Sequence, residues 1–474
     1  MQQASAIAWA QEEFGRARLG DAGRTARLVG MAREVAIRPA GRVSEVFQKA
    51  AERQGAYDLL ANPAVQVEQL QEAAAAVCVA RSAESPFVFV PVDGSSLTLT
   101  DRARVKDFGA IGASKFGARG LKVISAIGVS PDGVPVGLLS QQWWSRETAP
   151  KGRNKKRRGR DSRKVEEKET QHWLDAIEET TRRIERGAPQ TRAWFQLDRE
   201  GDAWPLLVAL TESKHDFTVR ASWNRRVHTA KGTRYLRDIV QKKRIVGTYD
   251  LHVPAGPGRT ERVARMAVRV ATVTLDLRDR TTGRAWALSV NVVWSRELRT
   301  TPRGEKPLDW MLLTSVECSS FEQACRVIFG YSQRWRIEEF HRTWKSGACK
   351  VEETQLHDTA QVKKWATMLA TVALRIERLK YLSRKQPDLP ASVELSAVEI
   401  RTLLLLKRAQ KKRNETVPDA MPSIAQATRW IADLGGYTGK SSGGPPGSIT
   451  IRRGLDEVRA GARVLEALES EHKM

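Results

Sequence analysis

Two short apolar runs, far apart in the sequence, constrain the fold of this chain more than any other feature. Residues 87–92 and 193–197 are rich in aromatic and aliphatic side chains, and an aspartate follows each run directly, Asp93 and Asp198. Such runs predict buried strands, although Pro91 weakens the first because proline cannot donate to a ladder. Ligand sites collect at the carboxyl ends of strands in α/β sheets. Both aspartates are therefore candidate site residues.

The two ends of the chain have helical periodicity. Residues 1–80 predict a helical N-terminal domain, in which Asp21 and Ser44 can cap helices and residues 65–79 form a third helix. The many arginines of this domain favour DNA binding, and the alternative is a plain helical cap on the next domain. Residues 361–474 predict a second helical domain, with helices at about 360–384, 396–413, 423–434 and 452–470.

Between these ends, residues 81–360 alternate between strand-like and helical patterns. Residues 121–129 and 134–143 flank a Ser-Pro-Asp-Gly turn and predict a hairpin, and a helix follows at about 165–186. Residues 215–316 are strand-like almost throughout, with strands expected at 217–221, 247–253, 263–277, 285–294 and 310–315. The sequence therefore predicts an α/β core with a β-rich insertion, flanked by helical N- and C-terminal domains.

The charge of the chain predicts a polyanionic partner. Its 474 residues carry a formal net charge of +24, so binding to a polyanion should weaken steeply with salt. A membrane is not expected as a partner, because the sequence has no basic amphipathic anchor and no apolar run of about 18 residues. The N-terminus has no secretory signal and the four cysteines are irregularly spaced. Both features favour a cytoplasmic protein with reduced thiols.

A dense basic run lies at residues 151–164, where nine of the fourteen residues are lysine or arginine. We call this segment the basic arm. It has no apolar periodicity, so it predicts a loop or arm rather than a packed element. The alternative is a solvated loop without a partner. At this charge density we favour contact with phosphates, and the candidate DNA ligands are the cations at its centre, Lys155, Lys156, Arg157 and Arg158.

A helix is predicted over residues 331–345, and its polar side chains share one face. At about 100° per residue, five of them fall on one stripe beside Trp335, namely Tyr331, Arg334, Glu338, Arg342 and Lys345. Such a face suits a phosphodiester, because a carboxylate can hold a metal, cations meet phosphates and an indole can stack on a base. The alternative is a solvated face with salt bridges between neighbouring turns.

Glu338 is the long-range partner that we expect Asp93 and Asp198 to meet. Three converging carboxylates repel one another unless cations neutralise them, and hard divalent ions with oxygen ligands do so. Two Mg²⁺ ions about 4 Å apart can activate a water molecule and stabilise a leaving 3′ oxygen in phosphoryl transfer. The alternative is that each aspartate is a turn residue or helix cap, since 55 acidic residues allow many such triplets.

The pattern Y-x2-R-x3-E-x6-K, carried by Tyr331, Arg334, Glu338 and Lys345, resembles the signature of bacterial cut-and-paste DDE transposases of the insertion-sequence-four family. Further segments resemble the family in the same order along the chain and cover most of it, namely residues 19–29, 93–97, 137–144, 198–202, 308–315 and 334–341. The chain departs from the family at Gly94, in the basic arm and in a C-terminal loop.

The resemblance implies a ribonuclease-H-like catalytic core over residues 81–360, with the β-rich insertion at about 215–316. Within this core, Asp93, Asp198 and Glu338 would be the catalytic triad that holds the metal. The implied cofactor is Mg²⁺, with two ions for each active site and Mn²⁺ as a substitute.

The resemblance also implies a set of DNA contacts. Three residues would contact the phosphate near the cleaved end and assist the hairpin step, namely Tyr331, Arg334 and Lys345. Trp310 and Trp335 would hold or stack a flipped base, because extruding a base lets the strand end curl back. Arg220 would lie near the transferred strand.

The implied activity is cut-and-paste DNA transposition. The protein would bind terminal inverted repeats, nick their 3′ ends, form and resolve hairpins, and transfer the strands to target DNA. It would act as a homodimer in a synaptic complex, at the nucleoid in the bacterial cytoplasm. No nucleotide cofactor is expected, because phosphodiester exchange conserves bond energy and residues 435–441 lack the first glycine of a phosphate loop. The alternatives are a hydrolytic nuclease on the same core and a non-catalytic DNA-binding relative that inhibits transposition.

Overall fold

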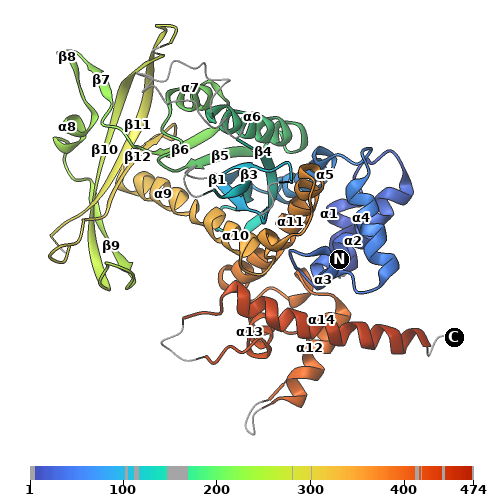
Figure 1. Ribbon diagram of the computed structural model, residues 1–474. Helices are drawn as coiled ribbons and strands as arrows, with labels where there is room; N and C mark the ends of the chain where they lie inside the picture. Colours follow the sequence, from blue (N-terminus) through green and yellow to red (C-terminus); the bar gives the residue numbers. More distant parts are fainter. Residues whose placement is uncertain are drawn as a thin grey trace. The chain divides into compact units, whose positions relative to one another are not determined.

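The structure is a computed structural model of a mixed α/β chain with helical ends (Figure 1). It describes residues 6–101, 105–111, 117–146, 169–279, 281–299, 301–411, 416–417, 419–439 and 444–471. The chain forms two compact units, each built from segments far apart in the sequence. The first unit comprises Met1–Glu84, Gly94–Ala149 and Arg336–Met474, and the second comprises Ser85–Asp93 and Pro150–Trp335. The predicted core, residues 81–360, therefore contributes segments to both units.

The N-terminal part of the first unit is helical, as predicted. Its helices are α1 (Ala6–Phe14), α2 (Ala22–Ile37), α3 (Val43–Val46), α4 (Ala50–Ala61) and α5 (Val67–Ser82). The predicted cap of α2 is confirmed, because a carboxylate oxygen of Asp21 accepts a 2.9 Å hydrogen bond from the Arg24 N–H.

The predicted helix cap at Ser44 is wrong. Ser44 lies inside the short helix α3, and α4 begins only at Ala50, after Lys49 as its N-cap. The physical reason is Phe47, which has extended backbone angles and ends α3. Its buried ring packs 6.4 Å from the ring of Trp365, between centroids. This tertiary contact outweighs the local preference for one continuous helix.

A hairpin in the first unit confirms the predicted turn. Strand β3 (Arg119–Val129) pairs in antiparallel register with β4 (Pro135–Trp144), and the short strand β2 (Gly109–Ala110) pairs with β3. In the turn, the Ser130 N–H donates a 2.8 Å hydrogen bond to the Val134 carbonyl. Gly133 has a φ of 92°, which is the left-handed region that favours glycine.

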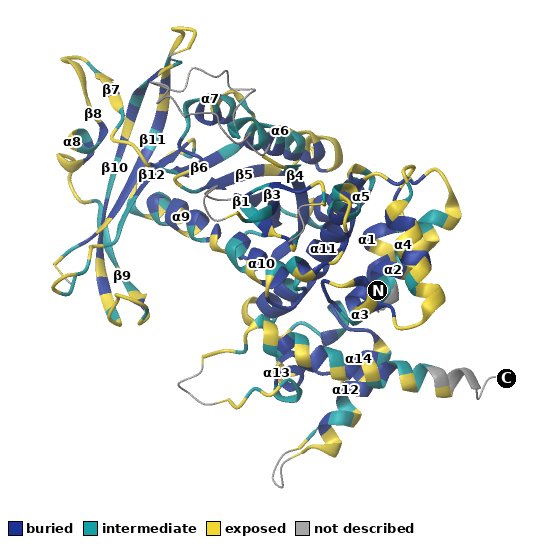
Figure 2. Cartoon of the chain, in the orientation of Figure 1, coloured by how far each residue is buried: buried dark blue, intermediate teal, exposed yellow. Residues whose placement is uncertain are grey.

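The rest of the first unit is helical, again as predicted. It contains α10 (Trp335–Lys345), of which Trp335 belongs to the second unit, then α11 (Thr359–Lys385), α12 (Ala397–Ala409), α13 (Ile424–Leu434) and α14 (Ser448–Glu471). Figure 2 shows that α11 is buried along most of its length. An apolar cluster joins its C-terminal half to α12, α13 and α14 through Leu379, Leu403, Ile431 and Leu455.

The second unit is built on a mixed sheet. Residues 87–92 of β1 (Phe87–Thr98) pair in parallel with β5 (Arg192–Leu197), which pairs in parallel with β6 (Asp216–Arg220). The sheet continues with antiparallel strands, β12 (Asp309–Thr314), β11 (Ala285–Glu297), β10 (Arg262–Arg278), β9 (Gly247–Val253), β7 (Arg226–Thr229) and β8 (Gly232–Tyr235). The strands predicted between residues 215 and 316 are thus present.

Helices cover the parallel part of this sheet. Helices α6 (Thr170–Gly187) and α7 (Trp204–Glu212) pack against β5 and β6, and Figure 1 shows α9 (Phe321–Ser332) on the other side of these strands. A further helix, α8 (Leu236–Gln241), contacts β10 and β8. Aromatic packing anchors α9, because the Phe329 ring lies 6.1 Å from that of Phe89, whose ring lies 5.2 Å from that of Trp194.

All four cysteines are free in the structure. Across the part of the chain that the structure describes, no helix combines the length and the apolar character needed to cross a bilayer.

Candidate active site

The register of two parallel strands places Asp93 and Asp198 at adjacent positions. In the pairing of β1 with β5, Val92 lies opposite Leu197, and the two aspartates are the next residues on each strand. Neighbouring strands are about 4.8 Å apart, and paired residues point to the same face of a sheet. One expectation is corrected, because β1 continues to Thr98 and Asp93 therefore lies inside the strand. What ends after Val92 is the pairing with β5.

The two carboxylates have different surroundings. Asp93 is 9% exposed, and its Oδ2 lies 3.7 Å from Nη1 of Arg334. Asp198 is half-buried, and its Oδ1 accepts a 2.7 Å hydrogen bond from the Glu200 N–H. This bond is typical of an aspartate that starts a turn. The alternative role that we considered for Asp198, that of a turn residue, is therefore observed. This role does not prevent Asp198 from also binding a metal ion.

Tyr331, also in the second unit, lies close enough to Asp198 for an electrostatic interaction. Its ring is 3% exposed and lies 5.6 Å from that of Trp310, in an edge-to-face arrangement. Burial raises the pKa of Tyr331 above its usual value, and the nearby guanidinium groups of Arg334 and Arg220 oppose this shift. Like an ordinary tyrosine, Tyr331 has a protonated phenol at neutral pH, so it can donate a hydrogen bond to an anionic oxygen.

The single helix predicted over residues 331–345 is wrong. Helix α9 ends at Ser332 and α10 begins at Trp335, so the five polar side chains do not lie on one continuous stripe. The cause is a tight turn, in which the Gln333 N–H donates to the Phe329 and Gly330 carbonyls and the Arg334 N–H donates to the Tyr331 carbonyl. Such bonds to the third residue back end an α-helix.

The burial of the polar side chains also differs on the two sides of the break between α9 and α10. Tyr331 and Arg334 are buried in the second unit, whereas Arg342 is exposed and Lys345 is half-buried in the first unit. The alternative of a solvated helix face with salt bridges therefore does not apply to Tyr331 and Arg334, because both side chains are buried. Trp335 is 53% exposed, and the Arg334 guanidinium carbon lies 5.2 Å from its ring centroid.

Glu338 lies in the first turn of α10, where the helix dipole favours a negative charge. Its side chain is half-buried. At the other end of the helix, Nζ of Lys345 lies 3.7 Å from Oε1 of Glu352. The same oxygen accepts a 2.7 Å hydrogen bond from the Thr98 N–H at the end of β1. Lys345 is thus held by an acidic neighbour that a phosphate could replace.

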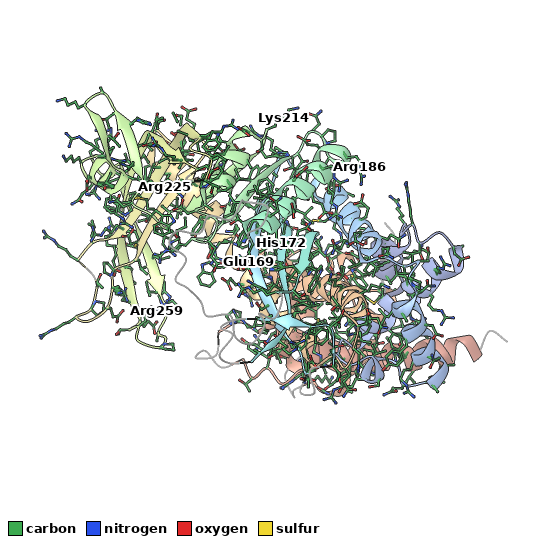
Figure 3. All side chains as sticks on the ribbon, turned by 45° about the horizontal axis from the view of Figure 1, so that its top comes forward. Glu169, His172, Arg186, Lys214, Arg225 and Arg259 are labelled. Carbon is green, nitrogen blue, oxygen red and sulfur yellow. The ribbon has the colours of Figure 1, made fainter. Side chains whose placement is uncertain are left out.

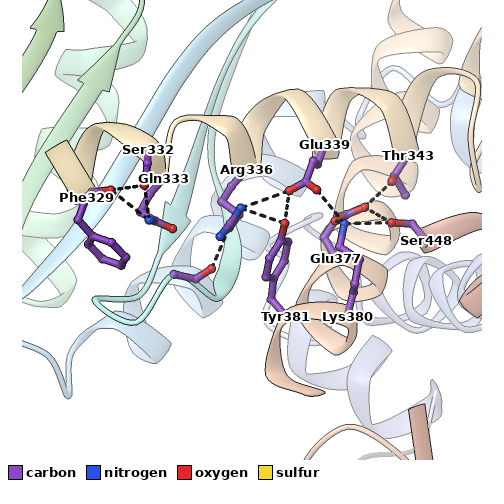
Figure 4. Close-up of polar contacts among 11 residues, drawn as sticks. Phe329, Ser332, Gln333, Arg336, Glu339, Thr343, Glu377, Lys380, Tyr381 and Ser448 are labelled. Atoms are coloured by element: carbon purple, nitrogen blue, oxygen red, sulfur yellow. Dashed lines mark hydrogen bonds and ion pairs between the residues drawn. The ribbon is translucent and has the colours of Figure 1, made fainter. Parts of the chain in front are cut away.

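A buried polar network fixes α10 to α11 and to the start of α14, as Figure 4 shows. We call it the α10–α11 network, and it consists of Arg336, Glu339, Thr343, Glu377, Lys380, Tyr381 and Ser448. Nζ of Lys380 lies 3.3 Å from Glu339 Oε1 and forms a second ion pair with Glu377. Burial alone would raise the pKa of Glu339, but Lys380 and the Tyr381 hydroxyl lower it overall.

Sequence reasoning missed this network. A signal was present, because Glu377 and Lys380 lie one turn apart in α11, shortly after the mostly apolar residues 365–374. Charged residues are almost never fully buried unless they are paired. That spacing therefore favoured an internal ion pair, and Glu339, next to Glu338, was a possible partner for it.

The oxygen ligands at this site suit a hard divalent cation. Asp93 and Asp198 offer carboxylates at adjacent register positions, which is the ligand type that Mg²⁺ prefers. Glu338 belongs to the first unit and the two aspartates to the second, so the meeting of all three stays a prediction. Among the residues that the structure describes, no group of three or more His, Cys, Asp or Glu side chains could hold a metal ion.

The remaining candidates are placed as follows. Arg220 is half-buried at the end of β6, where its Nη2 donates a 2.9 Å hydrogen bond to the Asp309 carbonyl. The candidate DNA ligands of the basic arm, Lys155, Lys156, Arg157 and Arg158, lie outside the described residues.

Two segments of the chain match known protein families. Residues 6–65, which span α1 to α4, match the family described as transposase DNA-binding. Residues 371–468, from within α11 into α14, match the family described as the transposase Tn5 dimerisation domain. Both matches lie outside the segments that contain Asp93, Asp198 and Glu338. They support DNA and a second copy of the chain as partners, and they support a DNA transposase similar to that of Tn5.

Proposed function

We propose that this protein carries out cut-and-paste transposition as a member of the insertion-sequence-four family, on a ribonuclease-H-like core. It binds terminal inverted repeats, nicks their 3′ ends, forms and resolves hairpins, and transfers the strands to target DNA. The observation that supports this proposal is the parallel pairing of β1 with β5, whose last pair, Val92 with Leu197, directly precedes Asp93 and Asp198. The matches to transposase DNA-binding and dimerisation domains support it independently.

In this proposal Asp93, Asp198 and Glu338 hold two Mg²⁺ ions, or Mn²⁺ in their place. When bound, such ions supply Lewis-acid chemistry that lowers the pKa of a water molecule and stabilises a leaving oxygen. Arg334, 3.7 Å from Asp93, limits the repulsion between the carboxylates. The same guanidinium can form a charge-assisted hydrogen bond to a phosphate.

Other side chains of the chain orient the DNA. The neutral Tyr331 phenol donates to the phosphate near the cleaved end, and Lys345 and Arg342 add positive charge from α10. The exposed indole of Trp335 stacks on a flipped base, while Trp310 supports Tyr331 from the edge. Two subunits pair through the C-terminal helices to hold two transposon ends in a synaptic complex.

One gel tests this function. The full-length protein is incubated with Mg²⁺ and the DNA that flanks its gene, and nicks, hairpins and insertions are separated under denaturing conditions. We expect 3′ nicks first, then hairpins, and finally joined products. Nicks without joined products would instead indicate a hydrolytic nuclease. A protein that binds the ends but never cleaves them with Mg²⁺ or Mn²⁺ would be a non-catalytic relative.

Replacing Asp198 by Asn should weaken the binding of Mn²⁺ at least about tenfold, because the amide removes a charged oxygen ligand and even outer-shell losses have effects of that size. Isothermal titration of the protein without DNA measures this directly. Glu200→Gln is the matched control, since Glu200 is an exposed acid two residues away on the same turn. Equal Mn²⁺ affinity in the wild type and Asp198→Asn would remove Asp198 from the site.

Neutralising Lys155, Lys156, Arg157 and Arg158 together should reduce the salt dependence of DNA binding. The slope of log K against log salt is expected to fall by about 0.9 for each phosphate contact that is lost. Fluorescence anisotropy with a labelled transposon end, over a series of salt concentrations, gives this slope. An unchanged slope would show that the basic arm does not contact DNA.

A further inference from the structure

An exposed tryptophan stands in a broad cleft of the second unit, next to the turn that follows Asp198. Trp223 is 66% exposed, which is unusual for so large an apolar side chain in a folded protein. The cleft has a volume of about 1050 Å³ and is also lined by Arg199, Arg226 and Arg278. This volume lies at the upper end for ligand pockets, so it suits a polymer segment rather than one small molecule.

The backbone around Trp223 is fixed by a single buried carboxylate. Asp202 is 2% exposed, and its Oδ2 accepts hydrogen bonds of 2.7 Å from the Ser222 N–H and 3.0 Å from the Trp223 N–H. Its Oδ1 accepts a 2.8 Å bond from Nε of Arg225, which Figure 3 labels, and Arg225 also donates to the Asp202 carbonyl. Trp223 is therefore exposed on a loop whose backbone is fixed by hydrogen bonds to Asp202.

This loop is also joined to the turn of the candidate active site. The Ser222 hydroxyl donates a 2.7 Å hydrogen bond to the carbonyl of Arg199, the residue that follows Asp198. Arg199 and Glu200, the two residues that follow Asp198 in the sequence, line the cleft, although Asp198 itself does not. The cleft therefore begins one residue beyond this candidate ligand, in the same unit.

The charges of the cleft favour phosphates over a neutral ligand. Arg199, Arg226 and Arg278 are exposed along it. Four acidic residues also line it, namely Glu200, Asp202, Asp276 and Asp279. Asp202 is paired with Arg225 and Asp276 lies 3.8 Å from the ring of His228, so the exposed charges of the lining are three arginines against one acid, Glu200. An exposed aromatic ring among exposed arginines is the combination that binds single-stranded nucleic acid, by stacking and by contact with the backbone.

We propose that this cleft binds a single-stranded stretch of DNA, with one base stacked on Trp223 and neighbouring phosphates bound by Arg199, Arg226 and Arg278. It is a binding site beyond those that the resemblance implies, which involve Trp310, Trp335 and Arg220. The identity of the strand, as the one that leaves the active site during cleavage, rests on the proposed function. The binding itself does not require cleavage.

The test measures the affinity of the full-length protein for a fluorescent oligothymidylate by anisotropy. We expect Trp223→Ala to weaken binding about 5- to 150-fold, as for the loss of one stacked base. Trp223→Phe should retain most of the affinity. The loss in Trp223→Ala should persist at high salt, since stacking releases no counterions, whereas the loss in Arg226→Gln should shrink. Tyr235→Ala is the control, because Tyr235 is 52% exposed but does not line the cleft.

A second measurement uses the unchanged protein and does not depend on a variant folding. Ultraviolet cross-linking to an oligonucleotide that contains 5-iodouracil should yield a peptide that includes Trp223. Cross-links only elsewhere, or wild-type affinity in Trp223→Ala, would overturn the proposal. A change of oligomeric state in Trp223→Ala with normal DNA binding would assign the cleft to a second copy of the chain and would also overturn it.

The outcomes are separable from those of the proposed function. Failure of oligothymidylate binding at Trp223 leaves the cleavage gel unaffected. If the gel shows no cleavage products, the effect of Trp223→Ala on oligothymidylate binding can still be measured by anisotropy.

Discussion

Glu338→Gln is expected to abolish cleavage of transposon ends while leaving their binding largely intact. The amide keeps the size and most of the hydrogen-bonding capacity of the side chain but removes the negative charge that a divalent ion requires. Loss of a preorganised electrostatic group in an active site costs at least about a hundredfold in rate. End binding should persist, because the matched DNA-binding segment at residues 6–65 does not include Glu338.

The measurement combines a cleavage gel with a mobility-shift assay on the same transposon-end DNA. Glu353→Gln is the matched control, since Glu353 is an exposed acid that forms only a surface ion pair with Lys350, at 3.2 Å. Surface pairs contribute little to stability, so this variant should cleave normally. Cleavage by Glu338→Gln at the wild-type rate would remove Glu338 from the metal site and with it the proposed triad.

Lys380→Met is expected to lower the free energy of unfolding of the first unit by about 3–5 kcal/mol. Lys380 forms ion pairs with both Glu377 and Glu339, and the side chains of Glu377 and Lys380 are 1% and 5% exposed. Removing one partner of a buried pair leaves an uncompensated charge in the interior, and this is the usual size of the effect. The methionine fills a similar volume, so a cavity contributes little.

Chemical denaturation followed by circular dichroism measures this loss as a shift in the transition midpoint. Asp250→Asn is the control, because Asp250 and Arg265 also form a close ion pair, at 2.9 Å, but both side chains are more than half exposed. Its midpoint should move little. If Lys380→Met and Asp250→Asn had equal effects, the α10–α11 network would have no special role in stability.

Much of the local structure could be predicted because it depends on neighbouring residues. The turn at residues 130–133 fixes the hairpin of β3 and β4, and Asp21 caps α2 through a residue three positions away. The capping box at the start of α9 follows the same logic, since Ser320 and Gln323 exchange hydrogen bonds. These preferences are short-range, and the sequence contains both partners.

The errors arose where distant residues override such preferences. The break between α9 and α10 follows Gly330, where a Cβ atom would lie 2.8 Å from Cε1 of Phe89 on a strand more than two hundred residues earlier. In the same way, Phe47 ends α3 because its ring packs near Trp365. Helical periodicity contains no information about either contact.

The candidate site likewise contains residues that could be predicted from the sequence and residues that could not. Its aspartates could be predicted, because each follows a recognisable apolar run and the ends of parallel strands meet. The roles of Asp202 and Trp223 could not, since they depend on hydrogen bonds between two loops about twenty residues apart. Asp202 lies in a motif that resembles the family, yet its carboxylate is used to hold backbone rather than to face a ligand.

The α10–α11 network has a consequence for how assembly and chemistry are connected. Glu377, Lys380 and Tyr381 lie within the segment that matches the dimerisation domain, whereas Glu339 is covalently next to Glu338. Glu339, which contacts the dimerisation segment through Lys380 and Tyr381, is therefore the direct neighbour in sequence of Glu338, the predicted metal ligand. A substitution that moves α11 would therefore also displace Glu338. We expect such a substitution to impair both dimerisation and DNA cleavage, and not only one of them.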